Sequence, residues 1–590
     1  MRPATLRAFR ILRALGLWKF YRSVFSLALL LALIAPIRAH AYDSIFDGSF
    51  EVVTDAPASD AEAARFLTMA TFGPTAEEIT HLRAVGYRQW LTQQLSMPTT
   101  LQRPAVELLD ADDPTPGQVD RLKTWLETAL TAPDQLRQRV AWALSQIMVA
   151  TFQQSKLGND PIALAEFYDT LARDAFGYYD ANGEPHAGTY PSLLYDVTRS
   201  TAMGKMLTYL RNKAGDAELG TYPDENYARE VMQLFSIGLV LRSRNFEPIL
   251  DDELNPIPTY IQATVSAYAQ VFTGWSYTSG FNSVPVGANW SPADYIPMIC
   301  YDQHHDEEHA KTLLSYTGNY GAGSDAFVLP AHNGCETDLE QGLSVIAHHP
   351  NVAPFISRQL IQRLTTSNPS PGYIERVANV FADDGYGVYG DLGAVVVAIL
   401  TDPEARYGAD APPAPYIFGK AREPLLKLTA LYRHYNAAAR DGSYSLLNYQ
   451  AYQQTPLGAP SVFNFYLPDY LPPGELADAG LFGPEFQITN ESSVFTAAND
   501  LRDRALLYVG NPDVDDDTLA LDLSGLQALA GDPDALVAQL GHDLMYGAMS
   551  EHMHATLTAM VAALPADDAM RRVTAALQVL LASPEFAIQK

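Results

Sequence analysis

The chain has 590 residues, and its 39 Lys and Arg against 68 Asp and Glu give a net charge of −29. A chain this acidic is not expected to bind nucleic acid through bulk charge. Hydrophobic residues make up 47% of it, enough for large buried cores, and its length predicts two or more domains or lobes.

The N-terminus has the three parts of a secretory signal peptide. Basic residues run as far as Arg22, an apolar run follows at 25–36, and Ala39-His-Ala41 is a small-x-small cleavage site. We predict cleavage after Ala41, so that residues 1–41 are the signal peptide and the mature protein is periplasmic or secreted. The apolar run is too short for an ordinary membrane span and no later run is long enough, so we predict no span after cleavage. An uncleaved anchor is the alternative.

Helical patterns dominate the rest of the chain. A polar lead-in at 42–58 precedes two capping boxes, Ser59-x-x-Glu62 and Thr75-x-x-Glu78, which begin helices that Gly86 interrupts. Residues 98–116 are rich in Pro and Asp and are predicted to form a loop. Further helices are predicted at 118–130, 135–151, 161–176, 191–211, 259–272, 339–348, 354–364, 371–383, 391–400, 425–436, 487–507, 523–530, 535–544, 550–564 and 570–581. No long alternating strand pattern occurs, so the predicted fold is mainly α, with long ordered loops and at most a few short strands.

One segment breaks the helical pattern. Residues 276–340 are rich in Gly, Tyr, Asn, Ser and Pro, and we predict a loop-rich insertion with a few short strands. The segment holds both cysteines of the chain, Cys300 and Cys335. In an exported protein they would form one disulfide, which closes a loop of roughly 35 residues; two free thiols are the alternative.

The stretch 222–239 is predicted to be a helix with clear start and stop signals. Asp224 is a good N-cap, Glu225 suits the helix dipole in the first turn, and Gly238 stands where a C-terminal glycine is expected. At about 100° per residue, apolar side chains share one arc. The opposite arc carries Glu225, Asn226, Arg229, Glu230, Gln233 and Ser236. On periodicity alone this polar arc is a solvated face with a Glu225–Arg229 pair.

Several motifs along the chain occur together, and in the same order, in a known family. They are Arg65-Phe-Leu-Thr-Met-Ala-Thr-Phe-Gly-Pro74, Arg139-Val-Ala-Trp142, Asp196-Val-Thr-x-Ser-Thr-Ala-Met203, Glu225-Asn-Tyr-Ala-Arg-Glu230, Phe272-Thr-Gly-Trp275, His305-Asp306 with Lys311, His349-Pro350, Pro354-Phe-Ile-x-Arg358, Arg422-Glu-Pro424 and Pro460-Ser-Val-Phe-Asn464. The chain therefore resembles the exported bacterial family catalogued as domain of unknown function 1800, over roughly residues 60–505, and we expect the resemblance to continue through the rest of the chain. We expect a helical domain at 59–505, with 506–590 as a C-terminal helical segment packed on it.

The resemblance bears on function in two ways. Glu225 to Glu230 is the family's hallmark, which implies that the polar arc lines a cleft. The family has no established activity to carry over, but its members are often encoded beside an exported sulfatase-like family, which implies a sulfatase-like partner.

A candidate site follows if the loop at His305 and Asp306 folds back onto this helix. Glu225, Arg229, Glu230 and Asp306 would then be catalytic residues, doing acid–base work on an ester or glycosidic bond. His305 and Asp306 would also suit a divalent metal ion, whereas an exposed loop in which Asp306 caps a helix is the alternative. Asn226, Lys311 and Arg358 would bind the substrate, the last two by holding an anionic group.

Two functions remain open on the sequence. The chain lacks a G-x-S-x-G elbow and a Gly-rich phosphate loop, which disfavours a Ser nucleophile and a nucleotide site. The first function is an exported hydrolase-like enzyme that uses the residues above. The second is a non-catalytic periplasmic or cell-surface binding or scaffold protein, in which the same residues form a buried salt-bridge network.

Overall fold

The structure is a computed structural model that describes residues 55–110, 117–154, 156–180, 182–216, 218–282, 295–316, 326–408, 417–445 and 449–590. The predicted signal peptide, its cleavage point after Ala41 and all but the end of the lead-in at 42–58 lie outside the described residues. Helices make up most of what is described, and the strands occur as two-residue pairs, which confirms the predicted mainly α fold.

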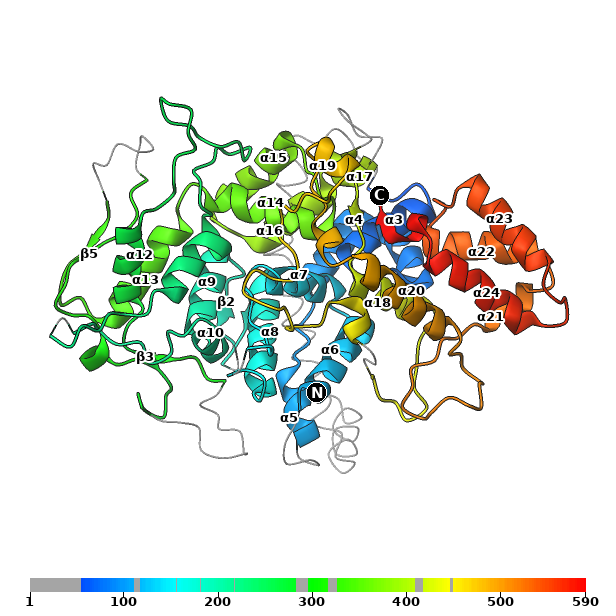
Figure 1. The fold of residues 1–590 in the computed structure, drawn as a ribbon, viewed down its shortest axis with the longest axis horizontal. Helices are drawn as coiled ribbons and strands as arrows, with labels where there is room; N and C mark the ends of the chain where they lie inside the picture. Colours follow the sequence, from blue (N-terminus) through cyan, green and yellow to red (C-terminus); the bar gives the residue numbers. More distant parts are fainter. Residues whose placement is uncertain are drawn as a thin grey trace, which may run out of the picture.

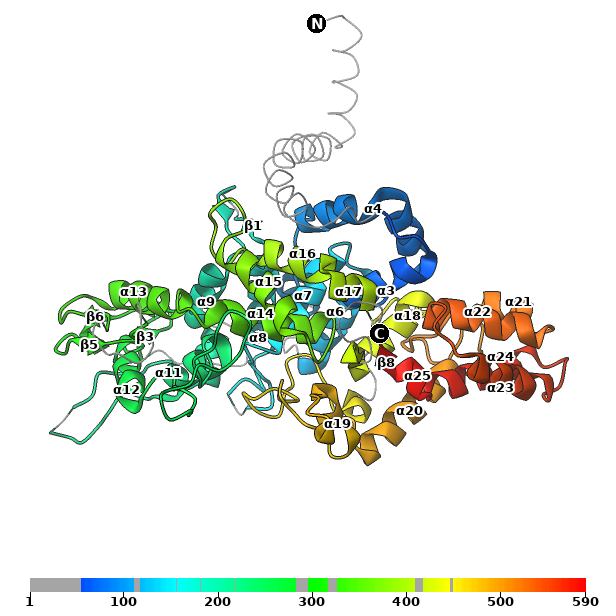
Figure 2. The ribbon, with the colours of Figure 1, turned by 90° about the horizontal axis from the view of Figure 1, so that it is seen from above.

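The first third of the molecule is built around one wholly buried helix. Its helices are α3 (Asp60–Ala70), α4 (Ala76–Ser96), α5 (Arg103–Asp110), α6 (Gln118–Thr131), α7 (Gln135–Ser145) and α8 (Pro161–Phe176). Every residue of α7 is buried, and the helix lies in the middle of the molecule in both ribbon views (Figures 1 and 2). Some of its polar side chains donate to neighbouring backbone: Arg137, for example, donates to the carbonyl of Ala172 at 3.0 Å and to that of Gly177 at 3.1 Å.

The next part forms the left end of Figure 1 and contains the predicted insertion at 276–340. Its elements are β1 (Tyr178–Tyr179), β2 (Pro185–His186), α9 (Tyr190–Arg199), α10 (Thr201–Met206), α11 (Asn226–Glu230), the π-helix η1 (Val231–Ser236), α12 (Gln262–Val271), β3 (Trp275–Ser276), β4 (Ile299–Cys300), the 3-10 helix η3 (Asp302–His304), β5 (Lys311–Thr312), β6 (Val328–Leu329) and α13 (Cys335–Ala347). The pairs β1–β2, β3–β4 and β5–β6 are antiparallel.

The remaining elements return to the centre and then form the right end of Figure 1. They are α14 (Val352–Leu364), α15 (Pro371–Ala382), α16 (Leu392–Thr401), α17 (Pro403–Tyr407), β7 (Lys420–Ala421), α18 (Pro424–His434), η6 (Tyr449–Tyr452), α19 (Glu475–Asp478), η7 (Pro484–Gln487), α20 (Glu491–Ala505), α21 (Ser524–Leu529), α22 (Pro533–Met545), α23 (Glu551–Ala562), α24 (Ala569–Leu581), α25 (Pro584–Ala587) and β8 (Ile588–Gln589). The last strand pairs antiparallel with β7, which joins the C-terminal segment to the central helices.

Local start and stop signals are confirmed where they act within one segment. Ser59 accepts the N–H of Glu62 at the start of α3, and Thr75 makes both bonds of its capping box at the start of α4. The two helices predicted around Gly86 are one run that kinks there, because Gly86 has a φ of 81° that other residues rarely adopt.

Several predictions about helix boundaries were wrong. The helix expected at 135–151 ends at Ser145. The expected loop at 98–116 contains α5, because the carboxylate of Asp169 on α8 accepts the N–H groups of Gln102 and Arg103 at 2.7 and 2.9 Å and caps the helix from outside. The single helix expected at 191–211 is broken into α9 and α10 by the extended conformation of Ser200.

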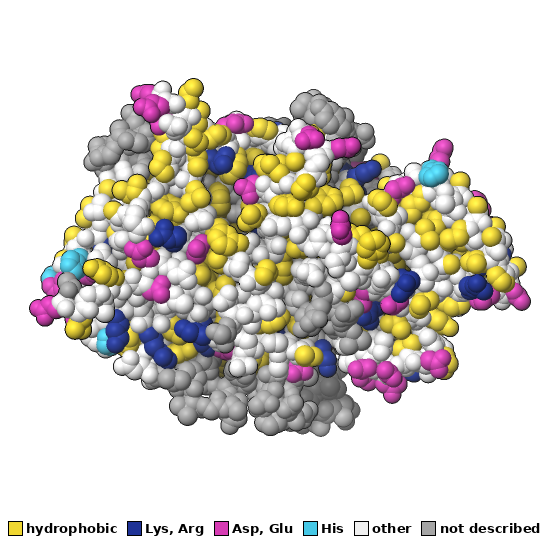
Figure 3. All heavy atoms as spheres, viewed as in Figure 1, with side chains coloured by type: hydrophobic (Ala, Val, Ile, Leu, Met, Phe, Trp, Pro, Cys, Tyr) yellow, Lys and Arg dark blue, Asp and Glu magenta, His cyan; other side chains and the backbone are white. Residues whose placement is uncertain are grey.

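The surface agrees with the acidic composition. On the face drawn in Figure 3, hydrophobic side chains are spread among uncharged ones, and acidic side chains gather over the loop that follows α20. Asp513, Asp515, Asp516 and Asp517 in that loop are exposed. Within the described residues, no helix combines the length and the apolar composition that a bilayer span requires.

Candidate functional site

The hallmark helix forms, but it changes type in its middle. α11 begins after Glu225, one residue later than predicted, and Asp224 supports its start by accepting the N–H of Asn226 at 2.9 Å. From Val231 the helix widens into the π-helix η1, in which the hydroxyl of Ser236 donates to the carbonyl of Val231. This widening rotates the residues that follow, so Ser236 is buried although it was predicted on the polar arc. Isolated π-helical turns occur frequently at functional sites.

Glu225 lies at the surface between α11 and α12. Its carboxylate accepts hydrogen bonds from Arg229 at 3.2 Å, from Gln262 at 2.8 Å and from Ser266 at 2.7 Å. Burial opposes ionisation here, but these hydrogen bonds and the charge of Arg229 outweigh it and hold the pKa of Glu225 below its usual value. The predicted Glu225–Arg229 pair is confirmed, and Asn226 beside it is exposed.

Glu230 has the opposite environment. Its residue is only 8% exposed, and one carboxyl oxygen, Oε2, is fully buried without a hydrogen-bond partner among the described residues. Burial raises the pKa of Glu230, and the neighbouring charge of Arg229 only partly opposes the shift. α11 therefore carries two carboxyl groups whose surroundings move their pKa values in opposite directions. Such a pair is a common sign of acid–base assignments in enzymes.

His305 and Lys311 belong to a buried network that is centred on Asp338 of α13. The Oδ2 atom of Asp338 lies 3.0 Å from Nε2 of His305 and 2.7 Å from Nζ of Lys311, and all three side chains are at most 1% exposed. The other ring nitrogen of His305, Nδ1, lies 3.0 Å from both the hydroxyl and the carbonyl oxygen of Thr273. Sequence reasoning missed Asp338, because its partners lie about 30 residues upstream.

Asp306 acts locally. Its backbone N–H donates to Thr273, its carboxylate accepts the N–H of His309 at 3.2 Å and lies 2.8 Å from that histidine's Nδ1, and its carbonyl accepts from Lys311 at 2.6 Å. Asp306 thus caps the turn at His309, close to the alternative stated from the sequence, except that the residue is buried rather than exposed.

The two halves of the predicted site are held by different elements. The hydrogen bonds of Glu225 and Arg229 connect α11 with α12, and Glu230 makes none. Those of His305, Asp306 and Lys311 go to Thr273, His309 and Asp338. Among the described residues, no hydrogen bond or ion pair joins the two groups, so the predicted carboxylate–imidazole cluster is not assembled through direct contacts.

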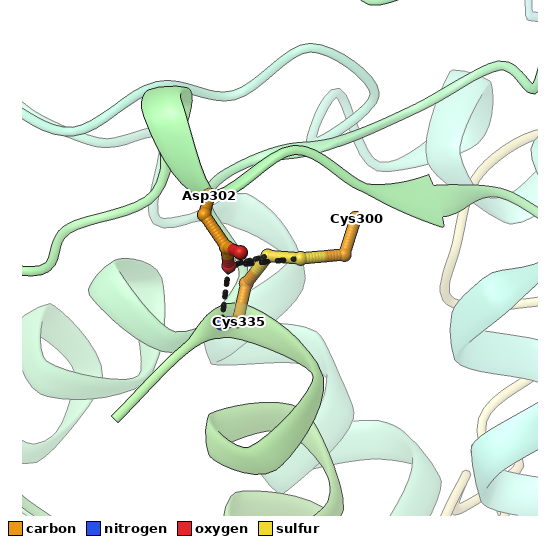
Figure 4. Close-up of side chains that lie close together, drawn as sticks. All are labelled: Cys300, Asp302 and Cys335. Atoms are coloured by element: carbon orange, nitrogen blue, oxygen red, sulfur yellow. Dashed lines mark hydrogen bonds between the residues drawn. A yellow bond between two sulfur atoms is a disulfide. The ribbon is translucent and has the colours of Figure 1, made fainter. Parts of the chain in front are cut away.

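The geometry of His305 and Asp306 does not fit the predicted divalent metal. Both ring nitrogens of His305 are already within hydrogen-bond distance of protein atoms. Across the part of the chain that the structure describes, one group of three His, Cys, Asp or Glu side chains brings ligand atoms within 4.8 Å of one another, and it is Cys300, Asp302 and Cys335. Figure 4 shows that the two sulfurs of this group face each other, with the carboxylate of Asp302 beside them.

Cys300 and Cys335 stand at disulfide distance, as predicted. Their Cα atoms are 6.1 Å apart, and the bond joins β4 to the first residue of α13. Asp302 accepts the N–H of Cys335 at 3.1 Å, which is a second link between the segment after β4 and the start of α13. The pair therefore belongs to the scaffold that holds Asp338 and His305 together.

Arg358 is the predicted substrate-binding residue that lies outside both groups. It is 8% exposed, contacts the carbonyl of Pro468 at 3.5 Å and lies over the rings of Phe246 and Phe482. Burial lowers the pKa of its guanidinium to about 10. Nothing in these contacts brings it to α11.

A second group of polar residues, which we name the central polar cluster, lies around α7. Its members are Arg139, Trp142, Gln146, Arg363, Lys420, Glu423, Gln454, Asn464, Tyr466 and Glu485. The Oε2 atom of Glu423 accepts hydrogen bonds from Trp142, Gln146 and Gln454 at 2.8 to 2.9 Å. Nζ of Lys420 lies 3.8 Å from Glu423 and 2.9 Å from Glu485.

Opposite pKa shifts occur in this cluster too. Burial opposes ionisation of Glu423, but the charges of Lys420 and Arg139 outweigh it and lower its pKa, whereas burial dominates at Glu485 and raises its pKa. Three motifs quoted from the sequence supply Arg139, Glu423 and Asn464. Those motifs were the signal in the sequence from which the central polar cluster could have been found. We gave those motifs no role because nothing in the sequence shows that they meet.

Among the described residues, the pocket that reaches the cluster is too small for a substrate-sized molecule. It has a volume of about 60 Å³ and is lined by Gln146, Arg363, Asn464 and Tyr466, and also by Leu234 and Phe355. That volume accommodates a few water molecules, whereas small-molecule sites usually enclose roughly 300 to 1,000 Å³. We therefore assign the central polar cluster to the scaffold. We take α11 as the candidate site because Oε2 of Glu230 is buried there without a hydrogen-bond partner among the described residues.

Comparison with known proteins identifies the family of the chain but no individual related protein. No curated protein and no solved structure matches the chain significantly. One family model, described as "Protein of unknown function (DUF1800)", matches residues 65–588, nearly the whole chain. This range confirms the resemblance seen in the motifs, including its expected continuation through the C-terminal segment. The chain belongs to the DUF1800 family.

Proposed function

We propose that this protein is an exported hydrolase-like enzyme whose reaction centre lies on α11. The observation that carries the proposal is Glu230, a nearly buried carboxyl group whose Oε2 has no partner and whose pKa is raised. Asp338, which we assign to the scaffold, is instead paired through both of its carboxyl oxygens. An unpaired carboxyl group costs folding free energy, and such groups are retained mainly where they act.

The two carboxyl groups of α11 suit different steps of a hydrolysis. Glu230 holds its proton to higher pH and would donate it to the leaving oxygen of an ester or glycosidic bond. Glu225 stays ionised and would accept a proton from the attacking water. Arg229, whose side chain is 40% exposed, and exposed Asn226 would orient the substrate beside them.

The test compares Glu230→Gln and Glu225→Gln with Glu253→Gln, an exposed glutamate elsewhere. The mature protein is assayed against chromogenic aryl esters and aryl glycosides. Loss of a general acid is expected to lower kcat by about 10²- to 10⁴-fold in the Glu230 variant, while the Glu253 variant keeps the wild-type rate. Equal rates in all four proteins would remove Glu230 from the mechanism.

Export rests on separate support. The basic, apolar and small-residue segments of residues 1–41 predict a cleaved signal peptide, and a disulfide pair favours an oxidising compartment such as the periplasm or the medium. N-terminal sequencing of protein recovered from those fractions is expected to begin at Tyr42. A chain that retains residues 1–41 in the membrane fraction would favour the uncleaved anchor.

The alternative is a non-catalytic binding or scaffold protein that works with a partner. The buried, fully paired Asp338 network favours it, because predicted site residues serve packing there. The sulfatase-like partner implied by the family stays a prediction. Cross-linking of the exported protein in producing cells tests this prediction. If the alternative holds, a stable complex forms and the Glu230→Gln variant still forms it. The protein is then also expected to hydrolyse no ester or glycoside.

A further inference from the structure

A second pocket lies far along the chain from α11, where three distant segments meet. It has a volume of about 680 Å³, within the range of small-molecule sites. Its walls come from α3, the end of α17, the residue after β7, the turn between α22 and α23, and the C-terminal α25 and β8. These elements lie side by side near the C-terminal label in both ribbon views (Figures 1 and 2).

Positive charge gathers in this pocket although the chain as a whole has a net charge of −29. The charged lining residues are Arg65, Arg406, Arg422 and Lys590 against Glu62 and Glu585. Both acids are already engaged by protein groups. Glu62 accepts from Arg406 at 2.8 Å, and Glu585 accepts the N–H and the hydroxyl of Ser550 at 2.9 and 2.7 Å.

Arg422 is the distinctive residue of the pocket wall. Its backbone N–H donates to the carbonyl of Ala587 at 2.8 Å, which fixes its position. Its side chain lies over the rings of Tyr546 and Phe586, at 5.9 and 5.2 Å from their centres, and makes no hydrogen bond or ion pair with any described residue. Glu423, next in the chain, accepts its hydrogen bonds within the central polar cluster.

The charge of Arg422 also acts on a neighbouring lysine. Burial, followed by the charge of Arg422, lowers the pKa of Lys427 to about 8. A guanidinium group can stack on aromatic rings and bind a carboxylate or phosphate oxyanion through two parallel N–H donors.

We infer that this pocket binds a small organic anion, with a carboxylate, phosphate or sulfate group on Arg422 and an apolar body against Met545, Tyr546 and Ile588. The inference does not depend on the reaction proposed for α11.

The experiment measures binding of benzoate, phenyl phosphate and phenyl sulfate to the full mature chain by isothermal titration calorimetry, with benzyl alcohol as the uncharged probe. At least one anion is expected to bind while the alcohol does not, and the preferred anion identifies the oxyanion class. Arg422→Gln is expected to weaken binding by about 10- to 100-fold, since hydrogen bonds to charged groups are lost. Arg571→Gln, an exposed arginine of α24, is the control and keeps the wild-type affinity.

A second pair of variants keeps the test decisive if Arg422→Gln does not fold. Ala548 is exposed on the pocket wall, so Ala548→Glu adds a negative charge there and Ala548→Gln adds nearly the same volume without charge. Weaker anion binding in the Glu variant alone supports the site. No binding of any anion, equal binding of the alcohol, or equal affinities in both Ala548 variants would overturn it.

Discussion

His349 is a buried side chain that is held in one charge state. It is 0% exposed, its Nδ1 accepts the N–H of Asn351 at 3.1 Å, and its Nε2 has no hydrogen-bond partner among the described residues. The imidazole is therefore neutral with its proton on Nε2. Burial lowers its pKa from 6.5 to about 4.

The sign of the resulting pH effect follows from linkage. The unfolded chain binds a proton on His349 more readily than the folded chain, so stability is intact above pH 6.5 and is lost as pH falls towards 4. At pH 4.5 this one group is expected to remove about 2 to 3 kcal/mol of unfolding free energy. Urea unfolding at pH 7 and at pH 4.5 measures this change in unfolding free energy. His349→Gln should lose less stability on acidification than wild type, whereas the exposed-site variant His552→Gln should lose the same amount.

Substitutions that neutralise Asp338 and Glu230 are expected to have different effects on the unfolding free energy. Asp338→Asn leaves Lys311 buried without its counter-charge, so the unfolding free energy should fall by about 3 to 5 kcal/mol at pH 7. The raised pKa of Glu230 means that wild-type stability falls as pH rises above the ordinary value of 4.5. Glu230→Gln removes that loss and should be neutral or stabilising at pH 7. A large destabilisation by Glu230→Gln would mark it as structural.

At the scale of elements, the turn after η1 fixes how the hallmark helix ends. Gly238 has a φ of 70°, and a Cβ placed there would lie 2.9 Å from the ring of Phe355. Gly220 has a similar φ of 66° with open space around it. A side chain at either position would be strained by the positive φ, but only at Gly238 would it also clash with a neighbour.

Alanine at the two glycines separates these effects. Gly220→Ala should cost roughly 1 kcal/mol of unfolding free energy, from backbone strain alone. Gly238→Ala should cost a further ~1 to 3 kcal/mol, because the ring of Phe355 must move. Thermal and urea unfolding measure both variants. Equal losses would show that the Phe355 ring yields freely.

Sequence reasoning succeeded for elements whose signals are local. The Ser59 and Thr75 caps, and Asp160 with Pro161 at the start of α8, act within one turn, so neighbouring residues suffice to predict them. It failed at α5, which is capped from another helix by Asp169, and at η1, whose wider turn invalidates the assumed rotation per residue.

The candidate site divides in the same way. Glu225 and Arg229 are four residues apart on one helix, and their pairing was predictable from spacing. The burial of Glu230 depends on how α11 packs, and the role of Asp338 depends on folding of the 276–340 segment onto α13. Lys420, Glu423 and Glu485 come together only through tertiary contacts, and periodicity carries no information about those.

At the scale of the whole molecule, Lys420 links two buried acids. It is 1% exposed, as is Glu485, while Glu423 is fully buried. Lys420→Met is expected to lower the unfolding free energy by about 3 to 5 kcal/mol, because both carboxyl groups lose their shared cation. Lys420→Met with Glu485→Gln should recover part of that loss. A double variant no more stable than the single one, in urea unfolding, would contradict the ion-pair account.

The pairing of β7 with β8 sets the order in which this chain can finish folding. Ile588 and Gln589 flank Lys420 and Ala421, and Gln589 donates to the carbonyls of Leu364 and Thr365 at 3.0 and 3.1 Å. Those partners are synthesised more than 160 residues earlier. While it emerges from the ribosome, the chain therefore lacks the strand that closes its centre. The native pairing that closes the centre can therefore form only after β8 has been synthesised.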